Sequence, residues 1–358
     1  MTVTNEQILN ALRVVQDPDL KRDLVALGFI KNVRIDKGRV AFTIELTTPA
    51  CPVRELMKDE AHRAVSALPG VSQVDITMSS QVRSSISAPS GGGLLPGVKN
   101  VIPIASGKGG VGKSTVSANL AYALARAGSR VGLLDADVYG PSIPHMLGIT
   151  APPEVDEHNR ITPVTQDGVA VMSMGFFMAP EDAVIWRGPM LHKTVQQFLG
   201  GVKWGELDYL LIDLPPGTGD VQLSLCQSIP VTGAVIVSTP QDVALNVAQK
   251  AIAMFKKLNA PIVGIIENMS GYECPHCHAR DEVFGVGGAR RTAERLEIPF
   301  LGEIPLATPV RESGDSGRPI VLSRPEAPAA RAFVAAAEKL AAQVSIRAMQ
   351  SQPVKVTF

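Results

Sequence analysis

This sequence has few cysteines and no net charge. Only four of its 358 residues are cysteines, and Lys plus Arg equals Asp plus Glu at 34 each. Four cysteines in a chain of this length do not resemble a disulfide framework. They favour a reducing cytoplasm, where a close cysteine pair is typically metal-binding or redox-active. A net charge of zero gives no argument for a nucleic-acid-binding surface or for attachment to an anionic membrane.

Long apolar runs are also missing. The longest apolar stretches have the length of strands, so no transmembrane helix is predicted. The first residues, MTVTNEQILNALRVV, show no basic region followed by an apolar run, and no secretory signal is expected there. With 45% hydrophobic and 19% charged residues, the chain has the composition of a folded globular protein. Its length suffices for two or three domains.

The segment 1–83 predicts a small α+β domain. TNEQILNALRVVQDPDL begins with a helix that Thr4 or Asn5 can cap, and its apolar residues recur at helical spacing. Strand-like runs follow in VRIDKGRVAFTIEL, then a helical stretch in RELMKDEAHRAVSAL and a last strand in VSQVDITM. Residues 84–100 are rich in Ser, Gly and Pro, which predicts a flexible linker.

Residues 101–345 show the pattern of a larger α/β domain. Apolar runs such as VIPIAS, YLLIDLPP and GAVIVSTP alternate with helical segments such as KSTVSANLAYALARAG. Strands that are apolar throughout and alternate with helices indicate a mostly parallel sheet covered by helices on both faces. The Ala-rich run APAARAFVAAAEKLAAQV is expected to form the closing helix, and residues 346–358 are expected to form a tail.

A phosphate-binding loop is predicted at Gly107–Ser114, where GKGGVGKS matches the P-loop pattern G-x-x-x-x-G-K-[ST] between a strand and a helix. The glycines let backbone N–H groups point at phosphate oxygens, and the helix N-terminus adds positive potential. Lys113 is expected to supply charge to the β- and γ-phosphates, and Ser114 a hydroxyl to Mg²⁺. The residues expected to contact ATP here are Gly107, Lys108, Gly109, Gly110, Val111, Gly112, Lys113, Ser114 and Thr115.

A second lysine within this loop carries a first resemblance. With Lys108, the segment KGGVGKS resembles the deviant Walker A motif of the family that includes MinD, ParA and the nitrogenase iron protein. In that family the corresponding lysine reaches the phosphates bound by the partner subunit. The resemblance therefore implies a homodimer in which Lys108 and Lys113 both act in catalysis.

Acidic residues follow the loop in an order that suits nucleotide hydrolysis. YLLIDLPPGTGD ends an apolar strand in Asp213, as a Walker B motif does, where a carboxylate holds Mg²⁺ through water; the glycines that follow allow a switch loop. The resemblance implies that Asp137, in DADVYGPS, orients or activates the attacking water and that Asp135 lies near the metal. Ser114, Asp135 and Asp213 are thus the expected magnesium residues. The resemblance also implies that Asn268 contacts adenine.

The segment GYECPHCHAR leaves several kinds of site open. A disulfide oxidoreductase places its Cys-x-x-Cys pair after an early strand of a thioredoxin-like domain, whereas Cys274 and Cys277 follow a late strand of a P-loop domain. These cysteines and the neighbouring His276 and His278 are too close in sequence to surround one zinc ion with ease, although two chains can share one. In a dimer, two cysteines from each chain supply the four thiolates that a [4Fe–4S] cluster needs.

Six motifs together are similar to the Mrp/ApbC family of iron–sulfur cluster carriers: KGGVGKST, DADVYGPS, VIWRGPM at 184–190, DYLLIDLPPGTGD, ENMSGYECPHC and FGVGG at 284–288. LTTPACP, at 46–52, resembles the small domain of cytosolic iron–sulfur assembly factors. The resemblance implies an ATP-hydrolysing homodimer that carries a cluster bridged by Cys274 and Cys277 of two chains. It implies an upstream donor that supplies the cluster and apoproteins that receive it, with no nucleic-acid or membrane partner.

Two other functions stay open on the residues alone. A MinD- or ParA-like spatial organiser needs a basic amphipathic C-terminal helix or a basic face, and RAFVAAAEKLAAQVSIRAMQ has few cations. An NTPase with a structural zinc site uses its cysteine pair for stability only. Cys226 falls on the apolar side of a helix pattern and is expected in the core. Cys51, at the expected start of a helix, is predicted either as a reactive or transient ligand or as a structural residue.

Overall fold

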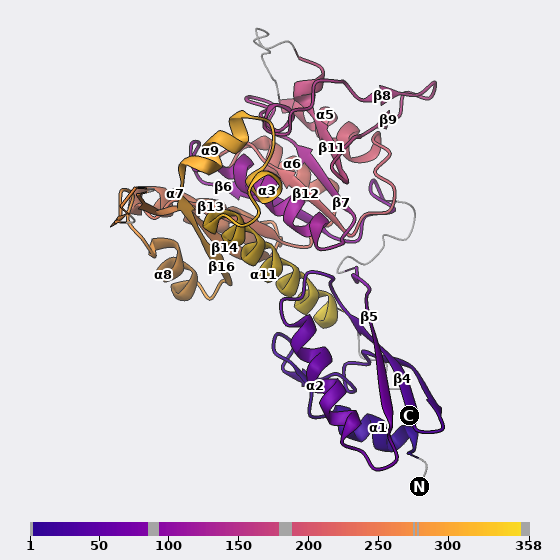
Figure 1. Ribbon diagram of the computed structural model, residues 1–358. Helices are drawn as coiled ribbons and strands as arrows, with labels where there is room; N and C mark the ends of the chain where they lie inside the picture. The colour runs from indigo at the N-terminus through magenta and orange to yellow at the C-terminus, as the bar shows by residue number, and fades with distance from the viewer. Residues whose placement is uncertain (1–2, 85–92, 179–187, 275, 278, 352–358) are drawn as a thin grey trace. The chain divides into compact units, whose positions relative to one another are not determined.

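The computed structural model describes residues 3–84, 93–178, 188–274, 276–277 and 279–351 (Figure 1). The chain divides into two compact units, one made of residues 1–83 and 349–358 and the other of residues 84–348. The VIWRGPM motif, up to Arg187, and His278 lie outside the described residues.

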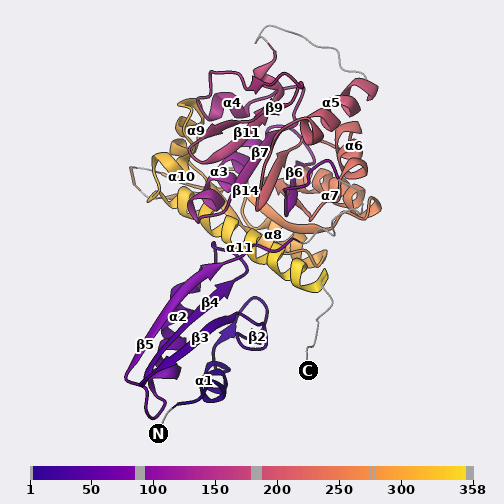
Figure 2. The same ribbon diagram turned by 90° about the vertical axis from the view of Figure 1, so that its right-hand side faces the viewer.

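The small unit is a three-stranded sheet with two helices, which confirms the α+β prediction. Its elements are α1 (Asn5–Leu12), β1 (Gln16–Asp17), β2 (Arg22–Asp23), β3 (Ile30–Asp36), β4 (Arg39–Leu46), α2 (Arg54–Ser66) and β5 (Gln73–Ser80). Strand β4 pairs antiparallel with β3 and parallel with β5, and α2 packs on β5 (Figure 2). Every second residue of β4 is buried, because side chains alternate between the two faces of a strand. As predicted, the Thr4 side chain caps α1.

The large unit is built on one sheet. Its strands are β6 (Val101–Ser106), β7 (Val131–Asp135), β10 (Val164–Gln166), β11 (Val169–Ser173), β12 (Tyr209–Asp213), β13 (Ala234–Ser238), β14 (Ile262–Glu273), β15 (Arg280–Asp281) and β16 (Phe300–Leu306), while β8 (Glu154–Val155) pairs with β9 (Ile161–Thr162) apart from it. The order is β10-β11-β7-β12-β6-β13-β14-β15, with β16 also paired to β14. Neighbours are parallel except β10 with β11 and β15 with β14. Every residue of β6, β7, β12 and β13 is buried, as expected for parallel strands covered on both faces.

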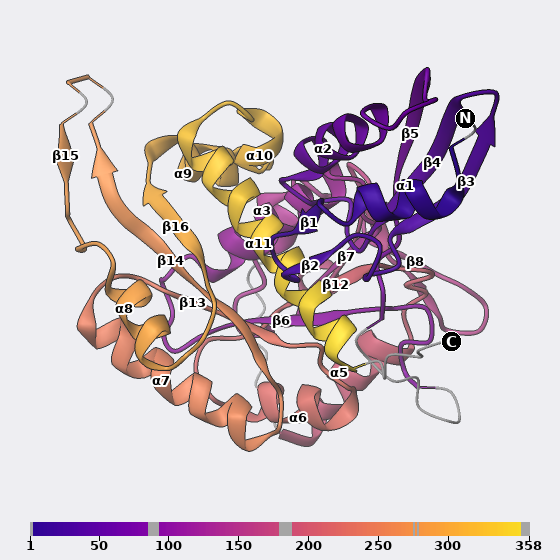
Figure 3. The ribbon, with the colours of Figure 1, turned by 90° about the horizontal axis from the view of Figure 1, so that it is seen from below.

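Helices cover both faces of this sheet. They are α3 (Lys113–Arg126), α4 (Ile143–Met146), α5 (Gly188–Gly200), α6 (Asp220–Ser228), α7 (Asp242–Lys257), α8 (Gly288–Arg295), α9 (Thr308–Asp315), α10 (Ile320–Ser323) and α11 (Pro328–Ser351), with a 3-10 turn η1 (Met174–Phe176). Figure 3 shows α6, α7 and α8 along one face and α3 and α11 along the other. Helix α11 runs into the stretch predicted as a tail, through residue 351. No helix within the described residues is long and apolar enough to cross a membrane.

The described second half of the predicted linker 84–100, residues 93–100, packs on the large unit. Leu95 and Val98 contact the buried core of that unit. The Lys99 ammonium lies 2.8 Å from the Asp208 carboxylate, and the Lys99 backbone N–H donates to the carbonyl oxygen of Leu207 at 3.0 Å. A prediction based on the Ser, Gly and Pro content of the segment does not include these few anchoring side chains.

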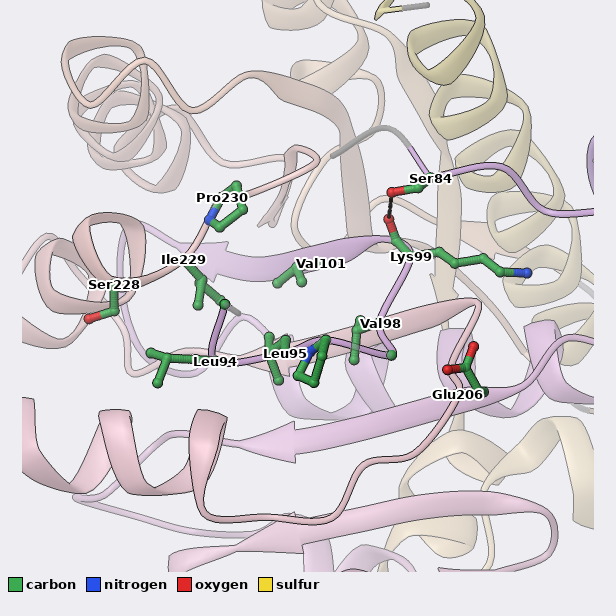
Figure 4. A pocket seen from close by; sticks show the side chains of 13 residues that line it. Ser84, Leu94, Leu95, Val98, Lys99, Val101, Glu206, Ser228, Ile229 and Pro230 are labelled. Carbon is green, nitrogen blue, oxygen red and sulfur yellow. Dashed lines mark hydrogen bonds between the residues drawn. The ribbon is translucent and has the colours of Figure 1, made fainter. Parts of the chain in front are cut away.

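A cavity of about 410 Å³ lies beside this segment (Figure 4). Leu95 and Val98 line it together with Val101 and with Ile229, just after α6. Val101 begins β6, whereas the P-loop follows Ser106 at the other end of that strand. Ligands of parallel α/β sheets bind at the carboxyl ends of the strands. This cavity therefore lies at the opposite edge of the sheet from the predicted nucleotide site.

Candidate functional site

The P-loop connects the end of β6 to the start of α3, as predicted. Gly112 has a φ of +76°, in the left-handed region that glycine adopts without strain, and a Cβ there would lie 2.3 Å from Nδ2 of Asn268. A Cβ on Gly107 would lie 2.4 Å from the backbone of Val247 in α7. Glycine is thus required at Gly112 by conformation and by close packing, and at Gly107 by close packing.

A cavity of about 240 Å³ opens over the loop. The predicted residues that line it are Lys108, Gly109, Gly110, Val111, Gly112, Lys113, Ser114, Thr115 and Asp137. The other predicted residues of the nucleotide site, Gly107, Asp135, Asp213 and Asn268, are buried rather than part of this lining. Lys108 is half-buried and has no ion-pair partner in the described part of the chain.

Lys113, Ser114 and Asp213 meet beneath the cavity. The Lys113 ammonium lies 2.8 Å from Oδ2 of Asp213, and the Ser114 hydroxyl donates to the same oxygen at 2.6 Å. Ser117, which the sequence analysis missed, donates to Oδ1 of Asp213 at 2.6 Å. Its only sequence signal is its place four residues after Lys113, on the same face of α3. Hard oxygen donors from a serine and an aspartate fit the ligand preference of Mg²⁺.

Asp135 lies near Asp213 and is held by hydrogen bonds within the protein. It is fully buried, Oδ1 accepts the backbone N–H of Asp137 at 3.1 Å, and Oδ2 accepts the Ser173 hydroxyl at 2.9 Å and the backbone N–H of Ile143 at 3.2 Å. Burial, and after it the charge of Asp213, raise the pKa of Asp135 well above the usual aspartate range. With both oxygens engaged by protein donors, Asp135 shapes the turn that holds Asp137.

Asp137 stands at the edge of the cavity. Its Oδ2 lies 4.0 Å from the Lys113 ammonium, and its side chain is 14% exposed. Burial raises the pKa of Asp137, while the charge of Lys113 opposes that rise. The structure therefore brings Asp137 close to Lys113 over the loop. The predicted contact of its carboxylate with an attacking water molecule stays a prediction.

Asn268 lies beneath the P-loop in strand β14. Its Nδ2 donates to the carbonyl oxygen of Val111 at 2.8 Å, and the side chain is 5% exposed. This contact joins residues 157 positions apart in the sequence. The amide therefore holds the loop backbone, a role that the predicted adenine contact did not include.

Cys274 follows the last residue of β14, in a hairpin that β15 closes. Its backbone N–H donates to the carbonyl of Ala279 at 3.0 Å, and Tyr272 pairs with Asp281 across the two strands. Cys274 is half-buried and Cys277 is exposed. Among the described residues, no group of three or more His, Cys, Asp or Glu side chains is placed to hold a metal ion. The hairpin thus presents a thiol pair.

The two other cysteines lie against the cores of the two units. Cys226, on α6, packs against the core of the large unit, as expected, and burial raises the pKa of its thiol to about 11. Cys51 is half-buried against the core of the small unit, three residues before α2. Of the four cysteines, only Cys277 is exposed.

Both units match known families. The large unit matches the family described as NUBPL iron-transfer P-loop NTPase over residues 97–341, and the small unit matches the iron-sulfur cluster assembly protein family over residues 5–76. The chain belongs to the NUBPL iron-transfer P-loop NTPase family. Its predicted resemblance to the Mrp/ApbC carriers is confirmed, since relatives named as such carriers match almost its full length.

Three curated relatives illustrate the family. The iron-sulfur cluster carrier protein of Deinococcus radiodurans is 49% identical over 98% of this chain and 98% of its own length. The carrier of the same name from Synechocystis is 47% identical over 97% of this chain and 99% of its own length. The iron-sulfur cluster transfer protein NUBPL of Mus musculus is 48% identical over 72% of this chain and 80% of its own length.

Solved structures match the large unit. The nucleotide-binding protein of Archaeoglobus fulgidus in complex with ADP has a TM-score of 0.55 and 44% identity, covering 62% of this chain and 87% of that one. The cell division ATPase MinD of Pyrococcus furiosus has a TM-score of 0.51 and 26% identity, covering 67% of this chain and 97% of that one. The large unit is therefore a P-loop NTPase of the ParA/MinD type, as the loop with its two lysines predicted.

Proposed function

We propose that this protein is an ATP-hydrolysing carrier that receives an iron–sulfur cluster, holds it at Cys274 and Cys277 and passes it to apoproteins. The observation that carries the proposal is the cysteine pair at the end of β14 in a P-loop NTPase of the ParA/MinD type. Relatives that match almost the full length of this chain are named iron-sulfur cluster carrier proteins. Their names favour this function over that of a MinD- or ParA-like spatial organiser and over that of an NTPase with a structural zinc site.

Nucleotide binding requires an exchange of partners at Lys113. Its ammonium pairs with Asp213 at 2.8 Å while its side chain lines the cavity over the loop. A γ-phosphate in that cavity attracts the ammonium and leaves Asp213 and the Ser114 hydroxyl as oxygen donors for Mg²⁺. Mg²⁺, when bound, neutralises negative charge on the phosphate oxygens.

Asp137 orients the water that attacks the γ-phosphate. Its carboxylate lines the cavity, and burial raises its pKa, which makes it a better proton acceptor than an exposed aspartate. Asp135 acts through Asp137, because it holds that residue's backbone N–H. Lys108, which has no ion-pair partner within the described residues, is assigned to the phosphates of a second copy.

The cluster is the cargo of a homodimer. Each chain contributes Cys274 and Cys277, and a two-fold axis doubles this pair to four thiolates, the usual ligand set of a [4Fe–4S] cluster. A hairpin with one exposed and one half-buried cysteine suits a carrier, because a bound cluster must leave again. An upstream donor and the acceptor apoproteins act in a reducing cytoplasm, where the thiols stay available.

Anaerobic reconstitution followed by iron and sulfide analysis tests this function. Cys274→Ala and Cys277→Ala should each lose the cluster's visible absorbance and the ability to activate an apoprotein, while ATP binding persists. Cys226→Ala is the matched control, because its side chain packs against the core of the large unit on α6, and it should keep one cluster per dimer. Zinc instead of iron and sulfide in the wild type, or a full cluster in the Cys274→Ala, Cys277→Ala double variant, would refute the proposal.

A further inference from the structure

One strand runs from the P-loop to the cysteine hairpin. Strand β14 contacts the P-loop through Asn268, whose amide donates to the carbonyl of Val111, and it ends at Glu273, next to Cys274. Strand β14 therefore contacts the P-loop at Asn268 and leads to Cys274 six residues later.

This strand is interrupted between the two sites. Asn268 pairs with Ile304 of β16 and Tyr272 pairs with Leu306, so four steps along β14 oppose two steps along β16. The extra residues form a bulge, Met269–Gly271. Bulges bend a strand and redirect the side chains that follow, and they occur often beside functional sites. The bulge therefore sets the direction in which the hairpin leaves the sheet.

The bulge is strained. Met269 has a φ of +58°, in the left-handed region where a side chain with a Cβ is disfavoured, and Gly271 has a φ of +64°. The Met269 side chain also reaches the P-loop, because its Cε would lie 3.4 Å from a Cβ placed on Gly112. Strained residues of this kind persist only where their surroundings hold them, and they cluster at switch regions.

The Glu267 side chain binds both the bulge and the start of helix α8. Its carboxylate is fully buried, Oε1 accepts the Ser270 hydroxyl and the Gly287 backbone N–H, and Oε2 accepts the Ala289 backbone N–H, each at 2.7 Å. Ser270 is within the bulge, whereas Gly287 and Ala289 belong to the start of α8. One carboxylate therefore fixes the bulge to a helix packed on the sheet.

Open space lies beside the hairpin. A cavity of about 480 Å³ is lined by residues 270–274 on one side and by Leu306, Ala307 and Ile320 on another. Packed interiors resist continuous deformation, whereas a segment beside a cavity has room to change its position. The bulge and the first residues of the hairpin thus have space to move without displacing the core.

We infer that the Met269–Gly271 bulge is a positioning device, which sets the geometry of Cys274 according to the state of the P-loop. A conformational change of the P-loop at Val111 and Gly112 displaces Asn268 and Met269, which contact it. The strained bulge then moves the hairpin, while Glu267 keeps the bulge attached to α8. The consequence for cluster release rests on the proposed function of the cysteine pair; the mechanical link does not.

Hydrogen–deuterium exchange measures the link without any cluster. The full-length protein is compared with and without a non-hydrolysable ATP analogue, and exchange is followed in peptides covering 270–274 and 279–283. In the wild type the analogue should change exchange in both segments by about fivefold or more, within the usual range of coupling between two sites. Met269→Gly should reduce this response to less than about twofold, because glycine adopts the left-handed conformation without strain.

Glu297→Gly is the matched control. Glu297 also has a left-handed φ, +54°, but it is exposed in the turn after α8 and touches neither the P-loop nor the hairpin strands. The substitution relieves the same kind of strain at a place outside the link, so it should keep the wild-type response. Glu267→Gln places an amide nitrogen against a backbone N–H and should lower the response as Met269→Gly does.

Cluster release provides the second readout. After anaerobic reconstitution, the rate of iron loss to a chelator is measured with and without the analogue. A merely structural defect changes the rates of iron loss with and without the analogue by the same factor. Loss of the link brings the ratio of these two rates towards one. An unchanged ratio in Met269→Gly, the same loss of response in Glu297→Gly, or no response in the wild type would overturn the inference. Absence of iron and sulfide in the wild type, together with an exchange response that Met269→Gly abolishes, would refute the proposed function and support the link.

Discussion

Replacing Lys113 by methionine should destabilise the large unit as well as abolish ATP hydrolysis. Lys113 is 6% exposed and Asp213 is 0% exposed, and their charged atoms lie 2.8 Å apart. Met keeps most of the side-chain volume but removes the ammonium. The substitution therefore leaves a buried carboxylate without its counter-charge, which is the most costly way to break an ion pair.

The expected loss can be worked from the contacts that remain. Removing one partner of a buried pair costs about 3–5 kcal/mol. Asp213 keeps the hydroxyls of Ser114 and Ser117, each at 2.6 Å, so we expect the lower end of that range, about 3 kcal/mol. For a unit of this size, 1 kcal/mol corresponds to about 2–4 °C, and the melting temperature should fall by about 6–12 °C.

Differential scanning calorimetry of the wild type and three variants separates stability from catalysis. The Lys113→Met, Asp213→Asn double variant should recover most of the lost melting temperature, because no unpaired charge stays buried, yet it should hydrolyse no ATP. Lys99→Met is the matched control, since Lys99 lies equally close to Asp208 but is 27% exposed. Its loss should stay below about 1 kcal/mol. A Lys113→Met melting temperature equal to that of wild type, or no recovery on adding Asp213→Asn, would contradict this reasoning.

Three further predictions concern single side chains. Asp137→Asn should bind ATP as the wild type does but hydrolyse it about a hundredfold more slowly, because water orientation is lost; equal loss of ATP affinity in a binding titration would make Asp137 structural. Lys108→Ala should lower turnover about a hundredfold or more with an unchanged melting temperature, and an unchanged ATPase rate would reduce Lys108 to a surface lysine. At pH 8, iodoacetamide should label the exposed Cys277 before Cys226, and labelling of Cys226 should rise only as the pH approaches its thiol pKa of about 11. Mass spectrometry that finds both thiols labelled equally at pH 8 would contradict the burial of Cys226.

The sequence predicted those features that depend on a few neighbouring residues. The P-loop is one, because its motif specifies a local backbone conformation, such as the left-handed φ of Gly112. The buried parallel strands are another, because apolar runs of strand length that alternate with helical segments are typical of a parallel sheet covered on both faces. Asp213 could be assigned from its position alone, since the end of such a strand faces the P-loop that follows β6.

The tertiary structure decided which residues meet across long sequence separations. One example is Asp135, which accepts the backbone N–H of Asp137 and the hydroxyl of Ser173, 38 positions away. Asn268 of β14 holds the P-loop at Val111, and Ser117 of α3 holds Asp213 of β12, because the loop and the helix that follow β6 pack against these strands. No local sequence pattern encodes such contacts. The sequence by itself determined the P-loop, the strand types and the cysteine pair, since these follow from backbone conformation and side-chain chemistry. The tertiary structure alone decided the hydrogen-bond partners of the buried polar groups and the bulge in β14, because packing between distant strands creates them.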